Sequence, residues 1–145
     1  MGLESGYYTI QNGQDLVGRR GIEDLSLRPK AIINQAGSAD RPWVVEALPN
    51  GLYSLSAKGT RAPIQDNAGT AIEDNKLVAL LMDPQYAVQW QLVAVNGKND
   101  TYRIVEPRGG SAWMVREPGK ESQVEVLNSI TGSASDAFTF KRVTA

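Results

Sequence analysis

The chain has 145 residues, 41 % of them hydrophobic and 21 % charged, which is typical of one soluble globular domain with its own core. Its 15 basic and 16 acidic residues leave a net charge of −1, too small to predict nucleic acid or an anionic membrane as a partner. Histidine and cysteine are both absent. Their absence excludes Ser-His-Asp and Cys-His catalysis, disulfides, and the common zinc, copper and haem sites. We therefore expect no enzyme, no metal and no cofactor.

The N-terminal residues 1–6 have neither the basic region nor the apolar region of a secretory signal peptide. No apolar run is long enough for a membrane span. The lack of cysteine suits a reducing compartment. From these patterns we predict a cytoplasmic protein, and we expect it to be a monomer.

Short apolar and β-branched runs predict strands along the whole chain, with no convincing helix pattern between them. A hairpin turn signal at residues 11–14 follows the first run, and residues 49–51 mark a later turn. Residues 59–75 contain glycine and proline and are predicted to form a long loop. Strands are expected at residues 6–10, 16–17, 31–33, 42–46, 51–55, 77–81, 88–93, 101–104, 112–115, 124–127 and 137–140.

Aromatic residues recur at a period of 45 to 49 positions. Three tyrosines mark the repeat, and each precedes a second aromatic residue by 35, 37 or 36 positions. A fixed period of this length, with several strand-like pieces in each unit, indicates repeats that close around a common core. The pairs are Tyr8 with Trp43, Tyr53 with Trp90, and Tyr102 with Phe138.

An all-β fold of the β-trefoil type fits this repeat, with twelve strands in three pseudo-symmetric lobes. The lobes are expected at approximately residues 5–47, 48–95 and 96–145 of a single domain covering residues 1–145. A propeller has blades of similar length, but three blades are too few for a stable ring. The repeated aromatic residues are predicted to pack in the core. Trp113 does not follow the repeat, and both a core position and a surface contact are open for it.

The stretch at residues 23–30 is the candidate functional segment, because it holds Arg28 directly before Pro29. A residue that precedes proline is pushed from the helical region into extended backbone, the form that a protease requires of a segment in its cleft. The Arg-Pro bond is also a tertiary amide, which trypsin-like enzymes cleave poorly. Such a segment is able to offer a basic side chain to a protease and resist cleavage. The alternative is an ordinary solvated turn.

Several motifs resemble the mushroom β-trefoil serine protease inhibitors, the family of cospin and cnispin. They lie at residues 3–10, 17–19 and 23–30, and the likeness continues through Trp43, residues 72–74 and Trp90. The opening motifs are shared more loosely with the mycocypins, which are β-trefoil inhibitors of cysteine proteases.

The resemblance implies tight, reversible inhibition of a trypsin-like serine protease by an exposed reactive-site loop. Arg28 stands at the primary specificity position, where cospin-like sequences have asparagine, and arginine suits a trypsin pocket with an aspartate at its base. Cnispin-like members use a lysine in the third lobe, so Lys120 is the candidate for a second inhibitory loop. The expected reactive-site residues are Ser26, Leu27, Arg28, Pro29 and Lys30. The first two are expected to lie extended along the protease cleft, and the last two on the leaving side.

Two acidic residues at the start of this stretch, Glu23 and Asp24, either hydrogen-bond the loop from beneath or form a solvated pair. Asn67 and Asn75 lie in the predicted long loop, where a further inhibitory site is conceivable.

Two other functions stay open. A carbohydrate-binding lectin is one, because many β-trefoils bind sugars, and Gln89 and Trp90 loosely match a lectin motif; no aspartate-bearing sugar pocket repeats in each lobe. The other is cysteine protease inhibition of the mycocypin type, through glycine-bearing loops such as the one near Gly37.

Overall fold

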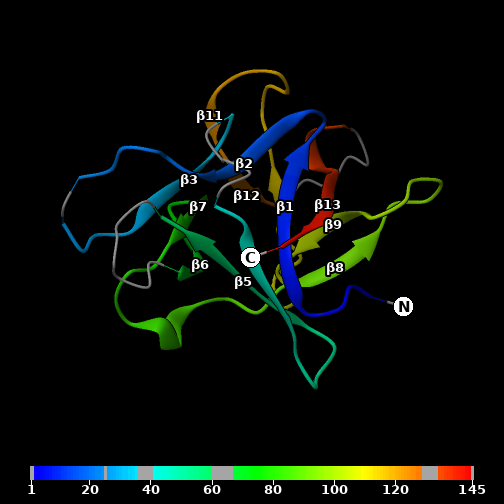
Figure 1. The fold of residues 1–145 in the computed structure, drawn as a ribbon, viewed down its shortest axis with the longest axis horizontal. Coiled ribbons are helices and arrows are strands. Elements are labelled where there is room, and N and C mark those ends of the chain that lie inside the picture. Colours follow the sequence, from blue (N-terminus) through cyan, green and yellow to red (C-terminus); the bar gives the residue numbers. More distant parts are fainter. Residues whose placement is uncertain (1, 25, 36–40, 60–66, 129–133, 145) are drawn as a thin grey trace.

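A computed structural model describes residues 2–24, 26–35, 41–59, 67–128 and 134–144. Apolar runs form antiparallel strands joined by turns (Figure 1). The helical elements of these segments are two three-residue 3-10 helices, η1 (Pro84–Tyr86) and η2 (Ala134–Asp136), and no helix among the described residues is suited to crossing a membrane. The strands are β1 (Gly6–Asn12), β2 (Asp15–Arg19), β3 (Lys30–Asn34), β4 (Trp43–Ala47), β5 (Tyr53–Lys58), β6 (Asn67–Glu73), β7 (Lys76–Ala79), β8 (Gln91–Ala94), β9 (Thr101–Val105), β10 (Ala112–Met114), β11 (Ser122–Gln123), β12 (Glu125–Leu127) and β13 (Phe138–Val143).

These strands pair into a continuous sheet in the order β11-β3-β2-β1-β13-β9-β10-β12-β7-β6-β5-β4, with β8 paired to β9. Two further pairings, β1 with β4 and β3 with β7, close the sheet on itself. The fold is therefore all-β with a barrel-like sheet, as the sequence predicts at the level of fold class.

The aromatic repeat reappears in the register of the strands. Each repeat tyrosine lies directly opposite its aromatic partner, so that spacings of 35, 37 and 36 positions in the sequence become cross-strand pairs. All six side chains are buried, which confirms that they form the core. The pairs are Tyr8 with Trp43, Tyr53 with Trp90, and Tyr102 with Phe138.

Trp113 belongs to the core, so the surface contact considered for it is wrong. Its side chain is 0 % exposed, and its ring centroid lies 5.7 Å from that of Trp43, 5.5 Å from Trp90 and 5.8 Å from Phe138. These three partners occupy equivalent positions in the three repeats. Only one ring fits at a point where three equivalent rings converge, which explains why the residue breaks the repeat.

The long loop predicted at residues 59–75 is wrong in its second half. Asn67–Glu73 forms β6, which pairs with β7 through a turn at Asp74 and Asn75. Both turn residues have positive φ, 53° and 64°, as a type I′ hairpin requires. The sequence pattern hides this strand because residues that it buries, such as Ala68 and Thr70, are small rather than large and apolar.

Candidate functional site

We call residues 20–29, which connect β2 and β3, the Arg28 loop; its described residues, 20–24 and 26–29, project from the barrel. It lies at the far left of Figure 1, at one end of the longest axis. The two strands pair beneath it, and Arg19 opposite Ile32 is the last paired position before the chain leaves β2. The conformation of the loop therefore depends on the side-chain contacts made at the end of β2 and at the start of β3.

A buried ion pair fixes the first end of the Arg28 loop. The Arg19 guanidinium donates from Nη2 to Oε1 of Glu23 over 2.6 Å, and from Nε to Oε2 over 3.1 Å. The Arg19 side chain is 0 % exposed and that of Glu23 is 10 % exposed. Arg41 donates from Nη1 to the backbone carbonyl of Arg19 over 3.0 Å. A two-pronged pair of this kind fixes direction as well as distance, so it sets the path of the chain as it enters the loop.

A second cluster fixes the other end. Lys30 is buried at the start of β3, and its ammonium donates to the Asp24 carboxylate, to the Asp24 carbonyl over 3.2 Å, and to Ser26 Oγ over 3.3 Å. The Asp24 carboxylate also accepts the backbone N–H of Ser26 over 2.9 Å, and the Ser26 hydroxyl. Of the two readings for the acidic pair, the structure therefore has the hydrogen-bonded one.

The charge state of Asp24 follows from these contacts. Hydrogen bonds from the Lys30 ammonium, and next from the hydroxyl and N–H of Ser26, hold the pKa of the Asp24 carboxyl well below its ordinary value of 3.8. The carboxylate is consequently ionised over the whole physiological range of pH, and its contacts stay in place there.

The tip of the loop consists of Leu27, Arg28 and Pro29, all of them exposed. The Arg28 guanidinium has no hydrogen-bond or ion-pair partner among the described residues, so it is available to another molecule. The backbone bends at Ser26 to Arg28, and the Arg28 N–H donates to Ser26 Oγ over 3.3 Å. The extended backbone expected along a protease cleft stays a prediction, because the Arg28 N–H has first to exchange its hydrogen bond to Ser26 for one to the protease.

The sequence predicts the exposed tip of the loop but not Arg19 and Lys30 as its anchors. It predicts Lys30 as a contact residue on the leaving side, whereas the structure buries its side chain and uses it to hold the loop. It assigned Arg19 no role. Both residues stand at the ends of paired strands, and the only sequence signal for their burial is the opposite charge of Glu23 and Asp24 in the loop between them.

Lys120, the candidate for a second inhibitory loop, lies in a tight turn. Its N–H donates to the carbonyl of Glu117 over 3.1 Å, Pro118 follows Glu117, and Gly119 has φ of 88°, which together describe a type II turn. Its ammonium lies 3.4 Å from the Glu117 carboxylate, and its carbonyl accepts Nδ2 of Asn34 over 3.1 Å. This folded backbone is less suited to a protease cleft than the Arg28 loop, and the role of Lys120 stays a prediction.

The residues that the sequence suggests for other binding functions do not belong to the Arg28 loop. Trp90 is fully buried and donates from Nε1 to Thr70 Oγ1 over 2.8 Å, whereas the neighbouring Gln89 is exposed. Asn75 forms the β6–β7 turn, and the loop near Gly37 lies outside the described residues. In the described part of the chain, no three His, Cys, Asp or Glu side chains gather where a metal could bind.

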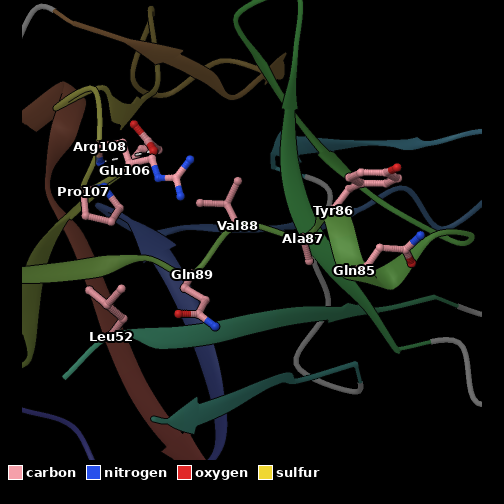
Figure 2. A pocket seen from close by; sticks show the side chains of 9 residues that line it. All are labelled: Leu52, Gln85, Tyr86, Ala87, Val88, Gln89, Glu106, Pro107 and Arg108. Atoms are coloured by element: carbon pink, nitrogen blue, oxygen red, sulfur yellow. Dashed lines mark hydrogen bonds between the residues drawn. The ribbon is translucent and has the colours of Figure 1, made fainter. Parts of the chain in front are cut away.

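A hollow of about 480 Å³ lies between the segment that contains η1 and the turn after β9 (Figure 2). Gln85 and Tyr86 line it on one side, and Glu106 and Arg108 on the other. The Glu106 carboxylate is engaged by the N–H groups of Arg108, over 3.2 Å, and Gly109, over 2.5 Å.

Comparison with known proteins gives consistent matches over the whole chain. The sequence pattern of the family Peptidase inhibitor I66 matches residues 1–142. A serine protease inhibitor of Lentinula edodes is 28 % identical over 140 residues, which cover 95 % of this chain and 91 % of the relative. A proteinase inhibitor from Coprinopsis cinerea has a similar solved structure, with a TM-score of 0.79 at 25 % identity, covering 98 % of this chain and 100 % of the other.

A ricin B-like lectin of Macrolepiota procera, solved in complex with lactose, has a TM-score of 0.72 at 15 % identity over 99 % of both chains. At that identity the likeness is one of fold alone. Both of these solved structures are β-trefoil proteins.

A barrel with projecting loops suits either a binding protein or an enzyme, and the matches decide between them: this is a protein of the protease inhibitor class and not an enzyme. The chain belongs to the peptidase inhibitor I66 family, which confirms the resemblance to the mushroom inhibitors. A protease is accordingly the partner that the family implies.

Proposed function

We propose that this protein inhibits trypsin-like serine proteases reversibly, with the Arg28 loop bound at their active site. The observation that carries the proposal is an exposed, unengaged arginine directly before a proline, at the tip of a loop held at both ends by buried basic side chains. The Lentinula edodes relative is named a serine protease inhibitor, which agrees with this class of target.

The Arg28 side chain would enter the specificity pocket, where an aspartate at the base pairs with its guanidinium. Leu27 and Ser26 would lie along the cleft, and Pro29 would supply the nitrogen of the bond facing the catalytic serine. That bond is a tertiary amide, which trypsin-like enzymes cleave poorly. The protease would thus hold the loop as a substrate and release it uncut.

Affinity in this scheme depends on order in the free loop. A protease–inhibitor interface buries roughly 1,600 Å² in total, and a buried arginine anchor contributes about 2–4 kcal/mol. Ordering a loose loop at binding would offset part of that gain. The Arg19–Glu23 pair and the Lys30–Asp24 cluster reduce this cost, because they order the chain on both sides of Arg28 before the protease arrives.

We also propose a β-trefoil of twelve strands in three lobes, at approximately residues 5–47, 48–95 and 96–145. Only Val124 separates β11 from β12, so that the two count as one strand of the third lobe. The pairings repeat in threes: β4 with β5, β8 with β9, and β13 with β1 join successive lobes. The Arg28 loop then joins the second and third strands of the first lobe.

No specific observation favours the two alternatives. The loose lectin motif does not offer its aromatic ring to a sugar, because Trp90 is buried. The loop near Gly37, on which the cysteine protease reading depends, lies outside the described residues.

The test is an inhibition assay against trypsin, chymotrypsin and papain, using the wild type and Arg28→Ala. Lys98→Ala is the control, because Lys98 is exposed in the β8–β9 turn, at the right end of the view in Figure 1. We expect inhibition of trypsin, weakened at least ~30-fold by Arg28→Ala and unchanged by Lys98→Ala. Inhibition of papain alone would support the mycocypin-like reading, and glycan binding without inhibition would support the lectin.

A further inference from the structure

The connection between β7 and β8 contains a second loop, residues 80–88, which we call the η1 loop. Its two ends are fixed to neighbouring positions of β6: Leu80 N–H donates to the carbonyl of Gly69 over 2.8 Å, and Val88 N–H donates to the carbonyl of Thr70 over 2.8 Å. Ala87 packs so closely that a Cβ added to Gly69 would lie 2.8 Å from its methyl carbon. Both ends of the η1 loop are therefore fixed to β6 in the free protein.

Strand pairing places the base of the η1 loop next to the base of the Arg28 loop. β3 and β7 are antiparallel, with Lys30 opposite Ala79. The Arg28 loop ends immediately before Lys30, and the η1 loop begins immediately after Ala79. The two loops consequently leave the barrel from the same end of one strand pair.

Exposed apolar side chains concentrate in these two loops. Among the described residues, six large hydrophobic side chains are exposed, and four of them lie here. Ile22 is 90 % exposed and Leu27 54 % in the Arg28 loop, while Met82 is 52 % and Tyr86 70 % in the η1 loop. Figure 2 shows Tyr86 on η1, across the hollow from Arg108, so the turn after β9 does not cover it.

The size of a protease interface requires such a second element. Interfaces of this kind take about 20–30 residues from each partner, or about 800 Å² per side. The Arg28 loop offers ten residues, so neighbouring surface has to supply the remainder. Tyrosine and methionine are enriched at interface cores, and tyrosine is a frequent energetic hot spot.

We infer that Met82 and Tyr86 form a second contact surface for the same serine protease, on the rim outside its specificity pocket. The inference rests on the proposed function of the Arg28 loop. Since both ends of the η1 loop are fixed to β6, its contact adds apolar area with a small cost for ordering the backbone, and the remaining cost is that of fixing two side chains. The protease surface that it meets is expected to be apolar and weakly charged.

The test compares trypsin inhibition by the double variant Met82→Ala/Tyr86→Ala with that by Tyr7→Ala/Ile72→Ala. The control pair removes the other two exposed large hydrophobic side chains of the described chain, which lie on β1 and β6. We expect the inhibition constant to rise about 10- to 100-fold for the first pair and less than about twofold for the control. Amide exchange in residues 81–87 is expected to slow when the wild type binds trypsin.

The outcomes separate this inference from the function on which it rests. If Arg28→Ala weakens inhibition but Met82→Ala/Tyr86→Ala matches the wild type, with unchanged exchange in residues 81–87, the second contact is wrong and the Arg28 loop stands. If Arg28→Ala has no effect on trypsin, the proposed function fails, and this inference fails with it.

Discussion

Removing the carboxylate of Glu23 should destabilise the protein strongly, because it removes both hydrogen bonds of a buried ion pair with Arg19. The Arg19 side chain is 0 % exposed and that of Glu23 only 10 %. Breaking a buried ion pair by removing one partner costs about 3–5 kcal/mol. For a chain of this size, Glu23→Ala should lower the melting temperature by about 10–20 °C.

The same loop base contains a matched control. Arg20 lies 3.2 Å from Glu121, but their side chains are 52 % and 59 % exposed. Exposed pairs contribute about 0–1 kcal/mol, so Glu121→Ala should cost less than about 1 kcal/mol. The double variant Arg19→Met/Glu23→Leu should be less costly than Glu23→Ala, because it replaces both members of the buried pair with apolar side chains.

Urea unfolding followed by tryptophan fluorescence measures all three free energies, with thermal unfolding by circular dichroism as a second readout. A loss for Glu23→Ala no larger than that for Glu121→Ala would refute the reasoning that burial sets the strength of this anchor. Folded Glu23→Ala should also inhibit trypsin more weakly than the wild type, since the entry to the Arg28 loop is loosened.

The remaining predictions concern the core and the charge of the loop. Trp113→Ala should lower the free energy of unfolding by about 3–5 kcal/mol, and Trp113→Phe by less than about 1.5 kcal/mol. Phenylalanine keeps a ring among the three aromatic partners and removes an Nε1–H that has no acceptor among the described residues. Equal losses for the two variants in urea unfolding would contradict this. Asp24 has a lowered pKa in the folded protein, so its ionised carboxylate contributes fully to stability above the ordinary carboxyl pKa of 3.8. This contribution is lost only as the pH falls through the lowered pKa of the folded state. NMR titration of its carboxyl carbon should show no step between pH 8 and 4, and Lys30→Met should move the midpoint upward; an ordinary midpoint in the wild type would count against the cluster.

The sequence predicts the parts of the fold that are marked by the aromatic repeat, and it does not predict the parts that lack such a repeat. The spacing of Tyr8, Tyr53 and Tyr102 from their partners predicted the core, since equivalent positions in repeats face the same interior. Trp113 could not be placed, because a residue shared by three repeats has no counterpart at the repeat period. β6 was missed because its buried residues are small and give no alternation of large apolar side chains.

The exposure of Arg28 and Pro29 agrees with the turn-forming character of this pair in the sequence, whereas the extended backbone and the reactive-site role of Arg28 stay predictions. The anchors were not readable. Whether Arg19 and Lys30 point inward depends on the register of β2 against β3, and this register is set by the closed sheet rather than by neighbouring residues. The sequence offered only the charges of Glu23 and Asp24 as a sign.

The most direct test of the central claim is the trypsin inhibition constant of Arg28→Lys beside that of Arg28→Glu. A pocket with an aspartate at its base accepts lysine but repels a carboxylate. We predict that Arg28→Lys inhibits within about tenfold of the wild type and that Arg28→Glu loses inhibition while keeping the wild-type melting temperature. Wild-type inhibition by Arg28→Glu would contradict the assignment of Arg28 as the residue that enters the protease.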